Sequence, residues 1–272
     1  MKKQIIFSSL IVFVIMPCLV FGAPFVRSHT GLINAPTADV VPHLGLELAG
    51  SVITYKGAGI ESNKSKIDWD ARLTAGLLDR FELGVTALTE KLYTGNFKLK
   101  VFDDSGELGI SDGTGGATPA VAWGVRDITG RTDITSTGTN NPYNSDQNNS
   151  LYVVASKKFN VQGIKFGITL GWGTNSFKAD TPLLKKFGGL FGGLNFPMPV
   201  NVIKELSLLI EMDGKHVNAG LEYGLPFPGI KVGVAAMSLD RLKTSDATTV
   251  GEGEGLSFGG GIIISSKGLG LW

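Results

Sequence analysis

Residues 67–90, IDWDARLTAGLLDRFELGVTALTE, alternate between apolar and polar positions. Ile67 and Trp69 share one parity, and Asp68 and Asp70 share the other. After a short break the alternation resumes with apolar residues again at every second position. A period of two is typical of β-strands, so the stretch predicts two strands of about 11 residues joined by a tight turn. The pattern alone leaves open which solvent the apolar face meets.

The same period recurs along the chain and predicts twelve strands, an even number, with one hairpin more or fewer (10–14 strands) also compatible. They are expected at 44–55, 67–77, 81–92, 96–102, 118–126, 151–158, 163–173, 187–195, 204–212, 216–224, 229–239 and 255–265. Helical periodicity is hard to find, because Gly, Thr, Val and aromatic residues dominate.

The polar parity of these strands carries charges of both signs, separated by glycines. The acids are Asp68, Asp70, Glu82, Glu90, Glu211, Asp213 and Glu222, and the bases are Arg72, Lys98, Lys100, Arg126, Lys158, Lys165 and Lys231. A water-exposed face would tolerate the same charges. Combined with strands of membrane length, however, the pattern favours an all-β, transmembrane, antiparallel up-and-down β-barrel, apolar outside and polar inside.

The N-terminus has the features of a secretory signal. Lys2 and Lys3 precede an apolar run over 5–21, and small residues follow at the expected cleavage site, which predicts a signal peptide over 1–22. A retained membrane anchor is the alternative. A lipoprotein centred on Cys18 is disfavoured, because Met and Pro precede this cysteine where small residues are needed.

Composition narrows the classes of partner and of chemistry. Of 272 residues, 43% are hydrophobic and 18% charged, and the formal net charge of +1 gives no electrostatic case for a nucleic-acid partner. Cleavage after Gly22 removes two lysines and the single cysteine, so the mature chain has a net charge of −1 and no disulfide. The predicted organisation is a signal peptide (1–22), an N-terminal segment containing GLINAPTA (23–43) and a barrel (44–272).

Connection lengths agree with a barrel whose N-terminus lies in the periplasm. The outer connections are then 56–66, 93–95, 127–150, 174–186, 213–215 and 240–254, and the inner ones 78–80, 103–117, 159–162, 196–203 and 225–228. Most long connections fall outside, as barrels prefer. Connection 103–117 is long for an inner turn and would fit a miscounted strand. These features predict the outer membrane of a Gram-negative bacterium, with membrane lipid as a partner; a secreted β-sandwich is the alternative.

Residues 30–49, TGLINAPTADVVPHLGLELA, are not explained by strand patterning. Thr-Gly-Leu-Ile-Asn-x-Pro-Thr-Ala resembles the opening signature of YjbH-like outer-membrane barrels, a family linked to exopolysaccharide production and export. Further segments resemble the family in order: VAWGVRDITG (121–130), LYVVASKKF (151–159), FGITLGWG (166–173), LFGGLNF (190–196) and LLIEMDGKHVNAGLEY (208–223). Several members are much longer, and this chain resembles only their first barrel unit. The resemblance implies a role in polysaccharide assembly or export, with polysaccharide or export-machinery proteins as partners.

Catalytic and cofactor motifs are weak. The chain has three histidines, His29, His43 and His216, and no Gly-x-Ser-x-Gly or His-x-x-x-His spacing. GEGEG at 251–255 is followed by neither a helix nor Lys-Ser/Thr, so it is not a phosphate loop. DDSGE at 103–107 lacks the full ligand spacing of a calcium loop. We therefore expect no catalytic residue, no cofactor and no metal site.

Nine charged residues are candidates for the barrel lumen: Arg72, Glu82, Lys98, Lys100, Arg126, Lys165, Glu211, Asp213 and Glu222. Either they form internal salt bridges that satisfy polar groups in a narrow barrel, or they line a lumen that binds or guides a glycan. The NAPTAD segment at 34–39 is expected to fold into the barrel or to line its inner mouth. Pro36 and Pro42 make it an unlikely central strand.

Three functional hypotheses follow. The first is a non-enzymatic accessory or scaffold protein of polysaccharide export, with its lumen closed by charge pairs. The second is a pore or transporter for small or apolar solutes. The third is a lipid-modifying enzyme barrel that would depend on His216.

Overall fold

The structure is a computed structural model that describes residues 30–56, 65–88, 92–109, 115–128, 149–178, 188–198, 205–240 and 256–266. The expected signal peptide and the start of the N-terminal segment lie outside these residues. Their boundary at residue 22 therefore stays a prediction.

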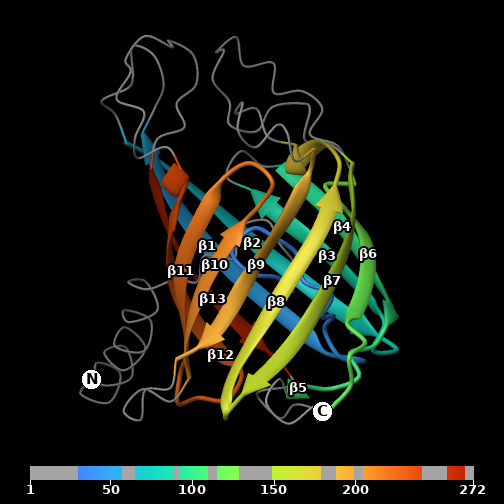
Figure 1. Ribbon diagram of the computed structural model, residues 1–272. Coiled ribbons are helices and arrows are strands. Elements are labelled where there is room, and N and C mark those ends of the chain that lie inside the picture. The colour runs from blue at the N-terminus through green and yellow to red at the C-terminus, as the bar shows by residue number, and fades with distance from the viewer. Residues whose placement is uncertain are drawn as a thin grey trace, which may run out of the picture.

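Within the described residues, twelve long antiparallel strands close into a barrel (Figure 1). They are β1 (Leu46–Lys56), β2 (Ser65–Leu77), β3 (Phe81–Leu88), β4 (Leu92–Phe102), β6 (Ala120–Arg126), β7 (Ser150–Val161), β8 (Ile164–Gly173), β9 (Leu190–Pro197), β10 (Leu206–Met212), β11 (Val217–Gly224), β12 (Ile230–Met237) and β13 (Ser257–Ser265). Each pairs with the next, and β1 pairs with β13, so the sheet has no open edge. No helix in this part of the chain is long and apolar enough to cross a membrane.

The outer surface of the barrel is apolar and the inner face is polar. On β2, Trp69 and Leu73 are 46% and 54% exposed, whereas Asp70 and Arg72 are 4% and 3% exposed. The parity of Trp69 therefore points outward and that of Asp70 points into the lumen. A closed sheet with an apolar outer band satisfies every ladder hydrogen bond internally and presents a surface suited to lipid. The predicted transmembrane barrel is confirmed, and the sandwich alternative is wrong.

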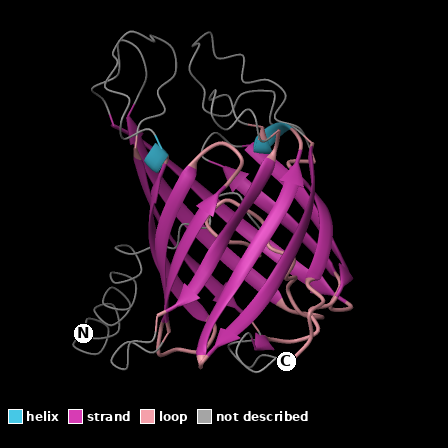
Figure 2. Ribbon diagram, viewed as in Figure 1, coloured by secondary structure: helices cyan, strands magenta, loops and turns pink. Residues whose placement is uncertain are grey.

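The two ends of the barrel differ in the length of their connections. At the end where β1 begins, called the turn end, short turns at 78–80, 162–163 and 225–229 join neighbouring strands. At the opposite end, called the loop end, the chain runs from Arg126 to Ser150 and from Met237 to Ser257 between strands. Figure 2 shows the described strands spanning the distance between the two ends.

Three details differ from the expected elements. The second hairpin turns earlier than predicted: β3 ends at Leu88 and β4 begins at Leu92, because Tyr93 continues the outward parity of β4. Connection 103–117 hides no barrel strand; it contributes the two-residue β5 (Leu108–Gly109), which pairs in parallel with β7 beyond the end of β6. His216 does not start a strand, since the Asp213 carboxylate holds its amide in a turn before β11.

The segment before β1 lies inside the barrel, where Figure 1 shows the blue start of the described chain surrounded by strands. We call residues 30–45 the plug. It forms a hairpin-like turn in which Gly31 bridges Pro36, Leu32 N–H donates to Ala35 C=O, and Thr37 N–H donates to Thr30 C=O. The plug joins no barrel strand, in agreement with the expectation drawn from its prolines.

Candidate functional site in the barrel lumen

The base of the plug is fixed to the β2–β3 turn at the turn end by contacts that we call the clamp. His43 N–H donates to Asp79 Oδ1 at 2.8 Å, and His43 Nδ1 accepts from Leu78 N–H at 3.0 Å. Leu44 N–H donates to Gly76 C=O at 2.9 Å. A Cβ atom on Gly76 would overlap the carbonyl oxygens of the plug here, so this glycine permits the close approach.

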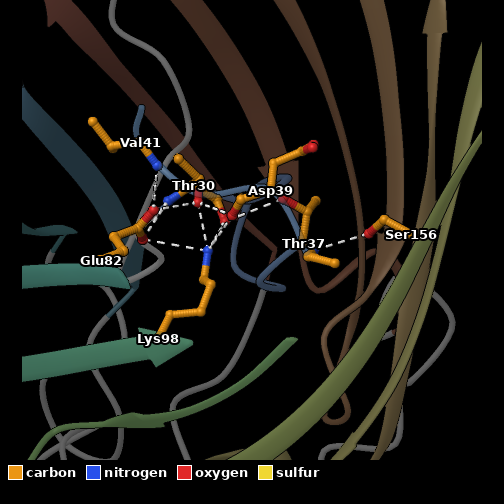
Figure 3. A network of polar contacts seen from close by, with 8 residues as sticks. Thr30, Thr37, Asp39, Val41, Glu82, Lys98 and Ser156 are labelled. Atoms are coloured by element: carbon orange, nitrogen blue, oxygen red, sulfur yellow. Dashed lines mark hydrogen bonds and ion pairs between the residues drawn. The ribbon is translucent and has the colours of Figure 1, made fainter. Parts of the chain in front are cut away.

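Glu82 and Lys98 form a buried ion pair that binds the plug on the turn-end side of its tip (Figure 3). Their charged atoms lie 3.3 Å apart, and both side chains are 0% exposed. Glu82 accepts hydrogen bonds from Thr30 Oγ1 at 2.7 Å and from Val41 N–H at 3.0 Å. Lys98 Nζ donates to the carbonyl oxygens of Thr30 and Asp39 at 2.9 and 2.8 Å. The pair therefore ties together the two ends of the plug's turn.

Glu211 binds the tip of the plug near the loop end. Its Oε2 accepts the amides of Ile33 and Ala35 at 2.8 and 3.0 Å, and its Oε1 accepts the amide of Asn34 at 2.7 Å. Asn218 on the neighbouring strand donates to the same Oε1 at 2.9 Å. One carboxylate thus satisfies three consecutive backbone amides, which could not otherwise be buried without large cost.

Arg126 and Asp213 complete the tip contacts. Arg126 Nη1 donates to Asn34 C=O at 3.0 Å and Nη2 to Ser176 Oγ at 2.8 Å, while its guanidinium carbon lies 4.5 Å from the ring centre of Phe177. Asp213 Oδ2 accepts from the Asn34 side chain at 3.0 Å. The tip is therefore held by two acids on one side and a base on the other.

Asp213 lies just beyond the end of β10, in the turn before β11. Burial alone raises its pKa, but His216 nearby and the amides of Lys215 and His216 outweigh burial and hold the pKa below its usual value. Asp213 is thus a stable carboxylate at the loop-end mouth.

Apolar plug side chains pack against two clusters in the lumen. Leu32 and Ile33 contact a cluster on β10 and β12 formed by Leu209, Ala235 and Met237. The alanines at 35 and 38 contact a second, larger cluster: Ala120, Ala122, Tyr152, Val154, Phe177 and Phe191. The plug is therefore packed as a core as well as hydrogen-bonded.

The lumen is open on the turn-end side of the plug, where a cavity of about 1020 Å³ remains. The plug contributes Leu32, Thr37 and Asp39 to its lining. The barrel wall contributes polar groups, among them Ser156, Lys158, Lys165, Thr169, Asn195, Glu222 and Lys231, together with apolar ones such as Phe166, Ile168, Leu209 and Ile263. The charged and hydroxyl-bearing side chains in this lining can form hydrogen bonds with hydrated or hydroxyl-bearing solutes.

Five of the nine predicted lumen residues meet around the plug: Glu82, Lys98, Arg126, Glu211 and Asp213. The other four pair elsewhere. Arg72 lies 3.2 Å from Asp70, Lys100 lies 2.8 Å from Asp103, Lys165 lies 3.0 Å from Glu107, and Glu222 lies 2.8 Å from Lys231. Internal salt bridges, one of the two expected roles, therefore occur beside plug contacts that the sequence did not predict, and the glycan-binding role stays a prediction.

Three contributors were not among the predicted residues. Ser156 Oγ accepts from Ala38 N–H at 3.0 Å and contacts Thr169 Oγ1 at 2.9 Å. Asn218 bridges the two acids at the tip, and Ser176 orients Arg126. Ser156 and Asn218 share the inward parity of their strands, but an uncharged side chain among small residues gives no separate signal in the sequence.

His216 lies at the loop-end mouth with its Nδ1 3.6 Å from Asp240 Oδ2. His43 belongs to the clamp at the base of the plug, and His29 lies outside the described residues. Across the described ranges, no group of three or more His, Cys, Asp or Glu side chains could hold a metal ion.

Closed topology, an apolar outer band and a polar lumen together define the architecture of an outer-membrane β-barrel protein. No family model and no curated protein matches the chain. Among solved structures, the chain is similar to an outer-membrane channel from Pseudomonas putida F1, with 10% identity, coverage of 84% of this chain and 97% of that one, and a TM-score of 0.40.

The chain is also similar to the NanC porin, with 11% identity, coverage of 80% of this chain and 98% of that one, and a TM-score of 0.41. For OprB of Pseudomonas putida the identity is 10%, the coverage 81% and 93%, and the TM-score 0.35. Likenesses this distant carry neither a solute nor a mechanism over to this chain.

Proposed function

We propose that the protein is a gated channel for small polar solutes in the outer membrane of a Gram-negative bacterium, and that the plug is its gate. In the conformation described here the plug closes the lumen. Solutes pass when the plug leaves its contacts with Glu82 and Glu211. The proposed solutes are polar, in contrast to the apolar ones that the sequence also allowed.

One observation carries the proposal: a cavity of about 1020 Å³, with charged side chains in its lining, leads up to a plug that is held by hydrogen bonds to charged side chains. Such bonds can be exchanged for bonds to water when the plug leaves, so they add little net free energy for their number. A barrel closed permanently would be filled more economically by apolar side chains from its own wall.

A scaffold protein of cell-surface polysaccharide assembly is the second candidate. It is favoured by the resemblance of residues 30–49 to YjbH-like barrels, because these residues include the plug. In this alternative the plug stays in place, the lumen stays closed, and polysaccharide or export-machinery proteins bind outside the lumen.

The two candidates are separated by locking the plug. The Ala38 amide nitrogen lies 3.0 Å from Ser156 Oγ, so cysteines at these positions are within reach of a disulfide. The chain's single cysteine lies in the expected signal peptide, so Ala38→Cys/Ser156→Cys forms one defined bridge. This pair of cysteine substitutions is introduced into the Glu211→Gln variant, in which the plug is expected to leave the lumen more often.

Single-channel conductance in a planar bilayer is the measurement. We expect discrete steps from Glu211→Gln, silence when the added disulfide is oxidised, and recovery of the steps after reduction. Verified insertion with no steps in any variant would contradict the channel and favour the scaffold. Steps that persist under oxidation would show that the plug is not the gate.

A further inference from the structure

The plug tip fills the lumen toward the loop end. The plug tip fits so tightly there that Ile33 and Ala35 are 0% exposed, and the wall residues Phe177 and Phe191 are 0% exposed as well. At the turn end, by contrast, a cavity of about 1020 Å³ remains even with the plug in place. Solutes and ions that cross the open barrel therefore pass the wall residues that now hold the tip.

Charge is distributed unevenly between the two halves of the lumen. Near the loop end, the inward-facing charged residues of the described strands and their adjoining turns include Asp68, Asp70, Glu211 and Asp213 against Arg72 and Arg126. Toward the turn end, Glu82 and Glu222 are paired with Lys98 and Lys231, and the cavity wall adds Glu47, Asp104, Glu107 and Glu205 against Lys157, Lys158 and Lys165. Among these residues the acids outnumber the bases by two near the loop end and by one toward the turn end.

Departure of the plug changes this balance further. Glu211 loses three amide donors and Asp213 loses the Asn34 side chain, so two carboxylates lose neutral partners and face the lumen. Arg126 loses the Asn34 carbonyl and keeps its contacts with Ser176 and Phe177. In a narrow passage with walls of low dielectric constant, such uncovered charges raise the local concentration of counter-ions.

We propose that the open channel selects cations, that is, inorganic monovalent cations and small ammonium-bearing solutes, and that Glu211 and Asp213 determine this selectivity. The proposal rests on the proposed gating by the plug and names the solute class of that channel. Cations replace the plug amides as partners of the two carboxylates, and Arg126 limits the preference without reversing it.

The test measures the ratio of potassium to chloride permeability from the reversal potential in a potassium chloride gradient. The parent is the full chain carrying Gly76→Ala, which displaces the base of the plug and leaves every lumen charge in place. Glu211→Gln and Asp213→Asn are then added together. The control is Asp103→Asn, which removes an acid that is paired with Lys100 at the turn end and lies outside the cavity lining.

We expect the parent to favour potassium by about tenfold, the lower end of counter-ion focusing in a charged cleft. The double neutralisation should bring the ratio close to one, and the control should leave it within a factor of two of the parent, that is, at least about fivefold. A parent that conducts without favouring potassium, or a ratio unaffected by the double neutralisation, overturns the selectivity proposal alone. Insertion without conductance in every variant, Glu211→Gln included, removes the channel function and the selectivity proposal with it.

Discussion

Replacing Glu211 by glutamine tests the hold of the barrel on the plug tip. The carboxylate accepts four hydrogen bonds, two on each oxygen, from the amides of Ile33, Asn34 and Ala35 and from the Asn218 side chain. Glutamine keeps one acceptor oxygen and turns an NH₂ group toward two of these donors. The substitution changes the side-chain volume little, so packing of the tip is preserved while its acceptors are halved.

The expected loss can be estimated from the donors left without a partner. Each buried donor without an acceptor costs about 1–3 kcal/mol, so two donors weaken docking of the tip by about 2–6 kcal/mol. In wild type, the Glu211 carboxylate is hydrated when the plug leaves, and this hydration favours the open channel. Glutamine gains less from hydration, so the expected loss of docking free energy lies at the lower end of this range. At about 1.4 kcal/mol per factor of ten, a loss of about 2 kcal/mol raises the ratio of open to closed channels about 30-fold.

Open probability in single-channel recordings is the assay, with Glu222→Gln as the matched control. Glu222 is a lumen acid of the same kind, but its hydrogen bond goes to Lys231 at 2.8 Å. We expect Glu211→Gln to be open about 30 times as often as wild type, while the control is unchanged. An open probability for Glu211→Gln within about threefold of the control, which corresponds to less than about 1 kcal/mol, would refute the assignment of Glu211 as the tip's anchor.

Three further substitutions probe the ion pair, the clamp and the lipid face. Lys98→Met should destabilise the barrel by about 3–5 kcal/mol in urea titrations in detergent, because Glu82 keeps a buried, uncompensated charge; adding Glu82→Gln should restore part of the loss, and no restoration would contradict the pairing. Gly76→Ala should make the plug accessible to protease, because the new Cβ overlaps plug carbonyl groups; Gly50→Ala, with its nearest atom 3.8 Å away, is the control, and equal protection in both variants would argue against the clamp. Leu73→Arg should cost about 2–4 kcal/mol of stability in bilayers if this side chain faces lipid at mid-depth, and a neutral effect would place it elsewhere.

The strand pattern could be predicted because a barrel wall obeys a simple rule. Inward and outward positions alternate, so a residue such as Trp69 reveals the face of its whole strand. Strand boundaries are hardest to predict where the alternation of apolar and polar positions continues through a turn. Tyr93 and Phe97 share the outward parity of β4, and nothing in the sequence separates the start of that strand from the preceding hairpin.

The candidate site could be predicted only in its parts. Parity places Glu211 and Arg126 inside the lumen, but it does not say what they bind. Their partner is the plug, which lies 178 positions from Glu211 at the Ile33 contact. Such a contact depends on the register of every strand between them, and the plug itself has no period of two. Its resemblance to a family signature marked it as unusual, without showing that it enters the barrel.

The attachment of the plug to the start of β1 has a consequence for the integrity of the wall. From Asn34 to Gly45 the chain can extend about 37 Å at about 3.4 Å per residue, while the hydrocarbon core of a bilayer is about 30 Å thick. The tip can therefore be drawn out through the turn end on its own tether while β1 remains paired with β2 and β13. Opening needs no break in the seam between the first and last strands. Any force that withdraws the plug along this tether must act from the turn end, because the tether is anchored there.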